Sequence, residues 1–536
     1  MALQFILGAS GTGKTTYLYH EVTRLAAKNP ETSYYFIVPE QFTLATQKAL
    51  VQCNPAGGIF NIDVLSLARL AHKVFEELGK EQRKVLKDIG KSMVIKRVLS
   101  ECRDNLSLFG ANAGQTGFVE EAKSLISELY QYGIGEAELQ EMMEANKDNE
   151  LLVKKLSDVL VLVRKFKELL GEQYMTSEGI YDALAECIDG SRFLKNCVIV
   201  LEGFTGFTPS QYELLKKLLR LAKTVYVSVT ITKEAAYAPK KEHDLFSMSK
   251  ATVDRLTALA KDARCEVLPP MVAGETDYRH KKESALHHLW ESLFKYPVRV
   301  KEGPVEQEIR LFAGADAKAE CRYAVTKMKQ LIQQEGYRYK DIAVIVSDIN
   351  QYGELMEQEL QASGIPCFLD YKKNMSENSF AEYLKAVLKL AETGLHTEGV
   401  LSYVKNSLSG WEKEQVFELE NYCLALGIKG YQFEKEWKRT YRTRRELPLE
   451  ELNACRERLI NELKPLITSF QNKNATVEEF TRTLFYFLKD HGLEKRLKAK
   501  EEEFLEQGDR LRAREYAQVY RVVLELFDQL VELLGK

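Results

Sequence analysis

Residues 5–15 read Phe-Ile-Leu-Gly-Ala-Ser-Gly-Thr-Gly-Lys-Thr, an apolar run that leads into a glycine-rich loop. The loop matches G-x-x-x-x-G-K-[ST] in full, and the residues after it predict a helix through about Ala27. Glycines in such a loop let backbone N–H groups turn towards phosphate oxygens at the positive end of the following helix. The predicted nucleotide-binding residues are Gly8, Ala9, Ser10, Gly11, Thr12, Gly13, Lys14 and Thr15.

The predicted cofactors are ATP and Mg²⁺, and two residues of this loop are expected to contact them. Lys14 is expected to reach the β- and γ-phosphates, and the Thr15 hydroxyl is expected to ligate Mg²⁺. Loops of this kind usually share the metal with an acidic residue at the end of a second core strand. Glu202 follows the apolar run Val198-Ile199-Val200-Leu201, so Thr15 and Glu202 are the predicted metal ligands.

Hydrolysis of the nucleotide needs a group that orients water. Helicase-type motors place a second carboxylate directly after the first, and here that position is Gly203. Gln211 could contact the γ-phosphate or its water, or it could be a solvated residue in the first turn of a helix; Glu213 lies nearby. The catalytic candidates are therefore Glu202 and Gln211, and we expect binding of ATP without efficient turnover.

Length and composition point to a cytoplasmic protein of three or four domains. The chain has 536 residues with a formal charge of -3, so any nucleic-acid surface must be a local basic stripe. The nine cysteines include no C-x-x-C pair, which argues against zinc or an iron–sulfur cluster within these residues. No apolar run approaches the roughly 18 residues that span a bilayer, so no membrane partner is expected.

The hydropathy pattern predicts an α/β fold built on a parallel sheet. Apolar strand-like runs alternate with amphipathic helices, as in a sheet covered on both faces, and these runs lie at 5–7, 34–38, 59–65, 198–201 and 225–229. Further strand-like runs separated by helices predict a second αβ domain, and they lie at 309–313, 342–346 and 366–369. The predicted divisions are a P-loop domain over 1–75 and 190–280, a helical insertion over 76–189, a second αβ domain over 281–395 and a helical domain over 396–536.

Longer stretches of the chain resemble the AddB (RexB) family. These are GASGTGKT from residue 8, FIVPEQFTLATQKAL at 36–50, NIDVLSLARLA at 61–71 and VIVLEGFTGFTPSQ at 198–211. Later stretches agree in the same order, at 319–348, 364–370 and 418–430.

The resemblance implies a P-loop fold similar to superfamily 1 helicases of the UvrD/RecB kind, with the four parts above as domains 1A, 1B, 2A and 2B. It places Gln41 and Ser66 in segments that contact single-stranded DNA. It implies a heterodimer with an AddA-type helicase/nuclease subunit that acts on single- and double-stranded DNA. AddB proteins contribute recognition of a Chi-type sequence to this heterodimer. Their nuclease domain holds an iron–sulfur cluster, and we expect both only in a C-terminal part beyond this chain.

A basic stretch near residue 440 is a second candidate DNA contact. Trp437, Arg439 and Arg442 lie in the densest basic run of the chain, with aromatic residues interleaved. Such a strip could follow a phosphate backbone while the indole stacks on a base, or it could be a solvated surface beside acidic neighbours.

The chain is therefore predicted to be the helicase-like N-terminal part of an AddB-type subunit. This subunit belongs to an ATP-dependent helicase/nuclease for double-strand-break repair and recombination. The alternatives are an autonomous DNA-stimulated ATPase or helicase motor, a P-loop kinase of a small metabolite, and a scaffold with a vestigial loop. The whole family member is a hydrolase, whereas the nuclease site is not expected in these residues.

Overall fold

A computed structural model of the chain describes residues 1–55, 57–80, 83–171, 173–239, 244–274, 276–303, 305, 308–369, 375, 378–441, 448–472 and 474–535. The chain divides into two compact units, Met1–Arg310 and Leu311–Lys536. The finer division into four domains stays a prediction. The boundary after Arg310 lies beyond the predicted start of a new domain at 281, because helix α12 (Ala285–Ser292) belongs to the first unit.

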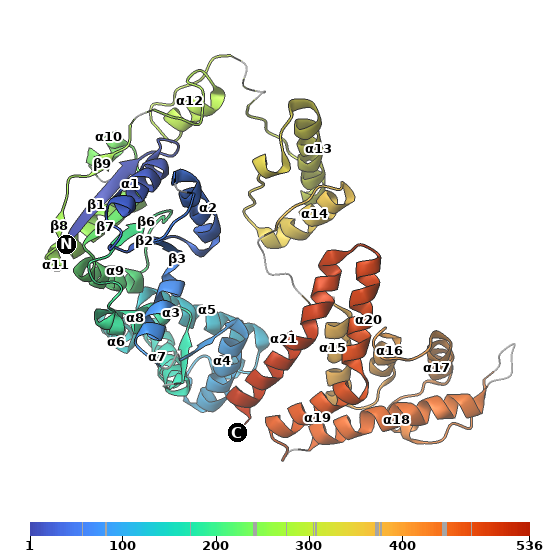
Figure 1. Cartoon of the computed structure of the whole chain (residues 1–536). Helices are drawn as coiled ribbons and strands as arrows, with labels where there is room; N and C mark the ends of the chain where they lie inside the picture. Colours follow the sequence, from blue (N-terminus) through green and yellow to red (C-terminus); the bar gives the residue numbers. More distant parts are fainter. Residues whose placement is uncertain are drawn as a thin grey trace. The chain divides into compact units, whose positions relative to one another are not determined.

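The first unit is built on a parallel sheet (Figure 1). Its strand order is β3-β2-β6-β7-β1-β8, and β9 also pairs with β1. All these pairings are parallel, as the sequence predicted. The strands are β1 (Ala2–Gly8), β2 (Tyr34–Ile37), β3 (Ile62–Leu65), β6 (Val198–Leu201), β7 (Thr224–Thr230), β8 (Glu266–Val267) and β9 (Met271–Val272).

Both faces of this sheet are buried, which explains why its strands are continuously apolar. Phe5 and Ile37 belong to one core cluster, whereas Ile6 and Phe36 belong to the other, because successive side chains point to opposite faces. Helices α1 (Lys14–Lys28) and α2 (Thr43–Cys53) contribute to the second cluster. The first cluster takes side chains from α3 (Leu67–Glu77), α8 (Ile180–Cys187), α9 (Pro209–Leu221) and α11 (Ser247–Asp262). The α/β class predicted from the sequence is therefore confirmed.

The register of the sheet aligns the carboxyl ends of its central strands. Ile37 pairs with Leu201, and Leu201 pairs with Val227. Gly8 at the end of β1 pairs with Thr230 at the end of β7. The loops that follow β1, β2, β6 and β7 therefore start from one edge of the sheet, where α/β proteins commonly bind ligands.

Helices dominate the segment between β3 and β6, as predicted. They are α4 (Asp88–Cys102), α5 (Thr116–Tyr132), α6 (Glu136–Ala145) and α7 (Glu150–Leu170). Helix α7 buries side chains that recur every three or four positions, among them Val159, Val163 and Phe166. A two-stranded parallel sheet of β4 (Lys84–Leu86) and β5 (Tyr174–Thr176) joins the two ends of this insertion, and the sequence pattern did not predict it. A short helix, α10 (Lys233–Tyr237), follows β7.

The second unit is helical in its described residues. Helices α13 (Ala317–Glu335) and α14 (Ile349–Ala362) share a small core of their own. A larger core joins the helices that follow, α15 (Ser379–Thr393), α16 (Thr397–Lys405), α17 (Lys413–Leu426), α18 (Leu449–Gln471), α19 (Val477–Asp490), α20 (Leu493–Glu506) and α21 (Arg510–Leu534).

The strands predicted for this second unit are absent from its described residues. The runs at 309–313, 342–346 and 366–369 have no strand assignment. Each run has a strongly exposed apolar residue, Leu311 at 98%, Ile345 at 95% and Phe368 at 88%. A strand is stable only when neighbours satisfy its backbone groups, and none of the described residues of this unit pairs with these runs.

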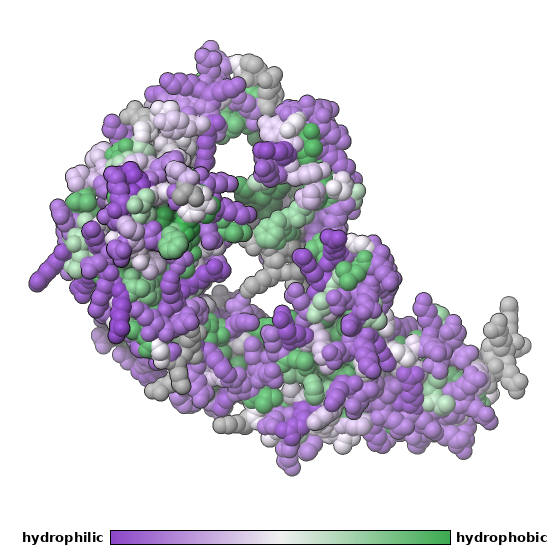
Figure 2. Space-filling model, in the orientation of Figure 1, coloured by the Kyte–Doolittle hydropathy of each residue, from purple (hydrophilic) through white to green (hydrophobic). Residues whose placement is uncertain are grey.

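Hydrophilic residues cover most of the face drawn in Figure 2, and hydrophobic residues form scattered patches on it. Among the described residues, no helix is both long and apolar enough to cross a membrane.

Candidate nucleotide-binding site

The glycine-rich loop connects β1 to α1 and is shaped by its glycines. Gly11 and Gly13 have φ angles of 83° and 86°, in the left-handed region that glycine adopts without strain. A Cβ on Gly8 would lie 2.5 Å from Thr12 Oγ1 and 2.8 Å from the Ala273 side chain, so this position also needs glycine. The loop therefore wraps closely before α1, and the first turn of α1 contains no acidic residue to oppose an anion.

Lys14 is buried inside the loop that precedes it. Its Nζ donates hydrogen bonds to the carbonyl oxygens of Gly8, at 2.8 Å, and of Ala9, at 2.9 Å. Burial lowers the pKa of Lys14; the charge of Glu202 opposes this shift, and that of Arg279 adds to it. The ammonium group is thus held at the centre of the loop, where the phosphates of a nucleotide would supply the opposite charge.

Thr15 and Glu202, predicted as the metal ligands, lie together although 187 positions separate them in the sequence. The Thr15 hydroxyl donates a hydrogen bond of 2.5 Å to Glu202 Oε1. Glu202 Oε2 is buried and has no hydrogen-bond partner in the described part of the chain. A buried carboxylate oxygen of this kind is costly unless it is paired.

This pair fits Mg²⁺ that arrives with a nucleotide. The described residues contain no group of three or more His, Cys, Asp or Glu side chains able to hold a metal ion. Mg²⁺ usually binds through one or two carboxylates and takes its remaining ligands from phosphates and water. Thr15 and Glu202 would therefore hold the ion, which would neutralise phosphate charge. The metal-binding and catalytic roles of Glu202 stay predictions.

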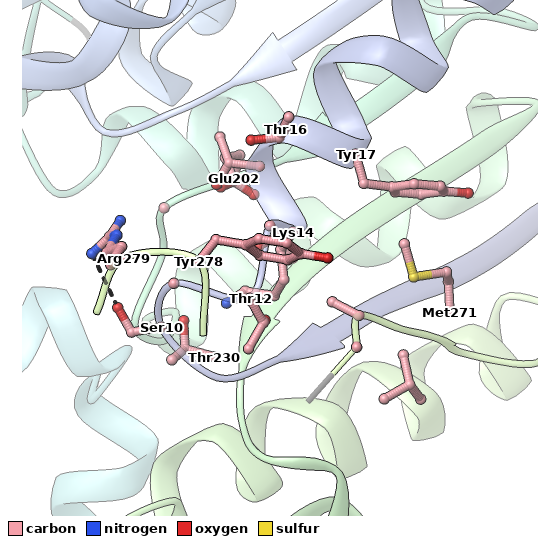
Figure 3. A pocket seen from close by; sticks show the side chains of 18 of the residues that line it. Ser10, Thr12, Lys14, Thr16, Tyr17, Glu202, Thr230, Met271, Tyr278 and Arg279 are labelled. Atoms are coloured by element: carbon pink, nitrogen blue, oxygen red, sulfur yellow. Dashed lines mark hydrogen bonds between the residues drawn. The ribbon is translucent and has the colours of Figure 1, made fainter. Parts of the chain in front are cut away.

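A cavity of about 840 Å³ opens above the loop and is large enough for a nucleoside triphosphate (Figure 3). Every residue from Ser10 to Thr15 lines it, and so does Glu202. Ser228 and Thr230 enter from β7, and Met271 enters from β9. The aligned carboxyl ends of the strands thus place one hollow over the loop.

Two residues of this cavity, Tyr278 and Arg279, were not predicted from the sequence. The Tyr278 ring approaches Gly13, and the Tyr278 amide donates to the Gly11 carbonyl at 3.1 Å. Arg279 Nη1 donates to Ser10 Oγ at 3.3 Å (Figure 3). The sequence offered a signal, an aromatic residue beside a basic one, but this pair directly precedes the domain boundary predicted between residues 280 and 281.

Gln211, the second predicted catalytic residue, does not line this cavity, and its contact with the γ-phosphate or its water stays a prediction. The side-chain carbonyl of Gln211 accepts a hydrogen bond from the Thr208 backbone amide at 3.0 Å. The backbone amide of Gln211 donates to Thr208 Oγ1 at 3.4 Å. This reciprocal pair is a capping box at the start of α9, which satisfies free N–H groups of the helix end. Glu213 is exposed on the same helix.

Of the residues predicted to contact DNA after β2 and β3, the structure exposes one and buries the other. Gln41 is exposed in a 3₁₀ turn, Glu40–Phe42, at the end of β2. Ser66 is buried, and its side chain accepts a hydrogen bond from the Arg69 amide at 3.3 Å as the N-cap of α3. The predicted DNA contact of the Ser66 side chain is therefore wrong, because its oxygen already caps a helix. The Gln41 contact stays a prediction.

The basic stretch near residue 440 contains both a buried and an exposed predicted contact residue. Trp437 is 5% exposed, stacks on Tyr422 at 4.7 Å between ring centroids, and donates from Nε1 to the Gln432 carbonyl at 3.0 Å. The predicted stacking of Trp437 on a base is therefore wrong, because the indole is part of a protein core. The Arg439 side chain is exposed, and its DNA contact stays a prediction. Arg442 lies outside the described residues.

Known proteins resemble this chain over its whole length. A family model described as "ADDB, N-terminal" matches residues 5–290, more than half of the chain. A protein of Lachnoclostridium phytofermentans, named as the B subunit of an ATP-dependent helicase/deoxyribonuclease, is 42% identical over 545 residues, covering 100% of this chain and 47% of that protein.

Two further proteins with the same name show the same pattern of coverage. One from Thermoanaerobacter sp. (strain X514) is 30% identical over 546 residues, covering 100% of this chain and 47% of its own length. One from Clostridium novyi is 28% identical over 534 residues, covering 99% and 46%. The chain thus spans about half the length of the curated relatives it matches. The match to the family model, supported by similarity along the entire chain, shows that this chain belongs to the AddB family.

Proposed function

We propose that this chain binds ATP with Mg²⁺ and forms the helicase-like part of the B subunit of an ATP-dependent helicase/nuclease. The observation that carries the proposal is the assembly of Lys14, Thr15 and Glu202 around one cavity at the start of α1. The backbone N–H groups of the loop and Lys14 would hold the phosphates, and Thr15 and Glu202 would hold the metal ion.

Two further side chains support binding of a triphosphate. Arg279 would supply a second positive charge near the phosphates, because its guanidinium group already contacts Ser10 in the loop. The Tyr278 side chain is exposed next to Gly13, so its ring is free to lie against the bound nucleotide. A cavity with these groups fits a nucleoside triphosphate better than it fits a small uncharged metabolite.

Turnover of ATP is proposed to be slow. Among the described residues that line the cavity, Glu202 is the only carboxylate. The next position, Gly203, has a φ angle of 81° and lies close to Pro39 and Phe42, so a side chain there would be strained. A group that orients the attacking water is therefore missing beside Glu202. We expect the chain to bind ATP without hydrolysing it efficiently.

DNA is the proposed macromolecular ligand, since the relatives are named as helicase and deoxyribonuclease subunits. The exposed turn that carries Gln41 and Phe42 supports a contact with single-stranded DNA, because an exposed aromatic ring can stack on a base. This turn lies beside Gly203, which lines the nucleotide cavity, so the two ligands would bind close together. Arg439 is a further proposed contact, to the DNA backbone.

The wider assignment follows from the name of the relatives and from the family. We propose a fold related to superfamily 1 helicases, a heterodimer with an AddA-type subunit, double-strand-break repair as the process and the cytoplasm as its location. Recognition of a Chi-type sequence is proposed for the complete subunit. The nuclease activity and its iron–sulfur cluster are proposed to reside in the part of the relatives that this chain does not cover.

A nucleotide titration of the purified chain tests ATP binding. We expect Mg²⁺-ATP to bind with an affinity that Lys14→Ala lowers at least tenfold, since the variant loses a charge-assisted contact to the phosphates. Lys28→Ala is the matched control, because Lys28 is an exposed lysine at the other end of the same helix. Equal affinities of the chain and of Lys14→Ala would refute the proposed site.

Binding of a single-stranded oligonucleotide at several salt concentrations tests the DNA contact. A phosphate-binding surface weakens as salt rises, and the slope reports the number of phosphates neutralised. We expect Phe42→Ala to weaken binding by roughly tenfold, as removal of one base–aromatic stack does. Phe470→Ala is the matched control, a similarly exposed phenylalanine on α18 in the other unit. Unchanged binding by Phe42→Ala would show that DNA does not use this turn.

A further inference from the structure

A short segment after β9, residues 276–290, packs on the glycine-rich loop of residues 8–15. We call this segment the strap and the glycine-rich loop the phosphate loop. The strap reaches the loop through hydrogen bonds from Tyr278, Arg279 and Trp290. The Tyr278 amide and the Arg279 guanidinium group contact Gly11 and Ser10, as described above. A further bond runs from Trp290 Nε1 to the Ser10 carbonyl, at 2.8 Å. The strap is therefore attached to the loop at both of its ends.

Asp277 is the residue that holds the strap in this conformation. Its side chain is only 1% exposed, and both carboxylate oxygens accept hydrogen bonds from the strap. Oδ1 accepts from the Arg279 amide at 2.9 Å and from the His280 amide at 3.3 Å. Oδ2 lies 2.8 Å from His280 Nδ1 and 3.0 Å from His287 Nδ1. A carboxylate can only accept, so both imidazoles carry a proton on Nδ1 and donate.

This carboxylate joins the turn that carries Arg279 to the helix that carries Trp290. His287 lies in the first turn of α12 and stacks on Trp290 at 5.4 Å between ring centroids. The contacts therefore run without a break from Asp277 through His287 and Trp290 to the Ser10 carbonyl. Removal of the carboxylate would release both ends of the strap, although the carboxylate itself does not line the cavity.

The loop is adapted to this contact at Gly11. A Cβ at Gly11 would lie 3.0 Å from Asp277 Oδ1 and 3.4 Å from the aliphatic carbons of Arg279. Gly11 therefore serves two purposes, the left-handed turn of the loop and the close approach of the strap. In contrast, the side chain of Tyr278 is 74% exposed, so its orientation depends on the backbone that Asp277 holds.

We propose that Asp277, with His280 and His287, is a positioning group that presets Tyr278 and Arg279 over the phosphate loop for a nucleoside triphosphate. This inference rests on the proposed function. Binding to a site whose competent conformation is fully populated avoids the loss of affinity that a disordered strap would impose. Asp277 contacts no ligand itself; it acts through Arg279 and Tyr278.

The test compares Mg²⁺-ATP affinities of the 536-residue chain and its variants. Asp277→Asn keeps the size of the side chain but replaces one accepting oxygen with a donor that faces the N–H groups of the strap. We expect its affinity to fall about tenfold, as it would if the competent strap were populated in roughly a tenth of molecules. Asp254→Asn, an exposed aspartate of α11 in the same unit, is the matched control and should bind as the parent chain does.

A mutant cycle separates positioning from a merely structural role. If Asp277 acts through Arg279 and Tyr278, adding Asp277→Asn to a variant that carries both Arg279→Ala and Tyr278→Ala should change its ATP affinity by no more than about twofold. Independent losses that multiply would overturn the proposal. Thermal unfolding of each ligand-free variant accompanies the cycle. If Asp277→Asn fails to fold, His287→Phe replaces it in the cycle, because phenylalanine can keep the stacking on Trp290 but loses the hydrogen bond to Asp277.

Failure of this inference is distinguishable from failure of the proposed function. If Lys14→Ala binds ATP as tightly as the parent chain, the nucleotide site itself is refuted. If Lys14→Ala loses binding while Asp277→Asn and His287→Phe retain the parent affinity, the site stands and the positioning role of Asp277 is refuted.

Discussion

At the scale of single residues, the site depends on charges that are buried before any ligand binds. Lys14 finds carbonyl oxygens in its own loop, and Asp277 finds four N–H donors in the strap. Glu202 is different, because Oε2 is buried without a partner in the described structure. Burial of an unpaired carboxylate oxygen is unfavourable, so Glu202 is the residue whose environment should change most when a cation arrives.

The first residue-scale prediction concerns Glu202→Gln. We expect this variant to lose the strengthening of ATP binding by Mg²⁺, by about tenfold or more, because an amide is a weak ligand for this ion. Binding of ATP in the presence of a chelator should stay the same or become tighter, since a negative charge near the phosphates is removed. Titrations with and without Mg²⁺ measure the difference, with Glu213→Gln on the exposed side of α9 as control. An undiminished Mg²⁺ effect would contradict the metal role.

The second residue-scale prediction concerns Asp158, a buried carboxylate of α7. It accepts hydrogen bonds from the amides of Ser107, Leu108 and Phe109 and from the Ser107 hydroxyl. Burial alone would raise the pKa of Asp158, but these four hydrogen bonds hold it below its ordinary value. Asp158→Asn should lower the free energy of unfolding at pH 7 by about 1.5–3 kcal/mol, the usual range for a hydrogen bond to a charged group.

The pH dependence of this difference has a definite sign. A carboxyl whose pKa is depressed in the folded state stabilises the fold above its unfolded pKa, and this contribution fades as the pH falls through the folded pKa. The difference in free energy of unfolding between the parent chain and Asp158→Asn should therefore have its largest value at pH 7. It should shrink below about pH 4, the ordinary aspartate pKa. Urea unfolding measures it, with the exposed Asp148→Asn as control. A difference that is independent of pH would exclude this origin.

At the scale of elements, helix ends explain why two of the predicted site residues have their polar atoms occupied. Ser66 directly follows β3, and Gln211 lies in the first turn of the helix after β6; both carry polar groups that could contact a ligand. Each is instead used in the N-terminal cap of a helix, α9 for Gln211 and α3 for Ser66. A helix start leaves N–H groups without partners, and a nearby side-chain oxygen satisfies them. The polar atoms are therefore occupied within the fold.

An element-scale prediction follows for Ser66. Ser66→Ala should destabilise the first unit by about 1 kcal/mol, the typical cost of a lost N-cap, and should leave DNA affinity unchanged. Ser66→Thr, which keeps a capping hydroxyl, should recover most of that stability. Gln41→Ala should do the reverse, weakening DNA binding without loss of stability, with the exposed Gln47→Ala of α2 as control. If Ser66→Ala kept its full stability but bound DNA more weakly, the predicted contact between Ser66 and DNA would be supported after all.

At the scale of the whole molecule, the nucleotide site is complete within one unit. The phosphate loop, Glu202 and the strap all lie in Met1–Arg310. The second unit has its own cores, formed by α13 with α14 and by α15 to α21. Ligand binding stabilises the part of a protein that contains the site, so the two units should respond differently to ATP.

Hydrogen exchange with and without Mg²⁺-ATP measures this whole-molecule prediction. At a ligand concentration about 100 times the dissociation constant, the first unit should gain about 2.7 kcal/mol, seen as slower exchange in β1 and β6. Exchange in α15 and α18 should stay unchanged, and Lys14→Ala should abolish the effect everywhere. Equal protection of both units would show that they unfold as one body.

The sequence by itself determined the elements whose signals are local. The loop at 8–15, the main-sheet strands β1, β2, β3, β6 and β7, and the helices of the insertion were predicted because periodicity, glycine spacing and apolar runs act over a few residues. The short strands β8 and β9 were not predicted. The strand-like runs at 309–313, 342–346 and 366–369 were mispredicted, because strand formation depends on partners that a local pattern does not contain.

Only the tertiary structure decided which distant residues share the site. It joined Thr15 to Glu202, brought Tyr278 and Arg279 onto the loop, and buried Trp437 in a core. These outcomes depend on strand order, on which helix ends need caps and on which side chains the cores enclose. Such contacts link positions up to 280 residues apart, as Trp290 and Ser10 are, and no local pattern encodes them.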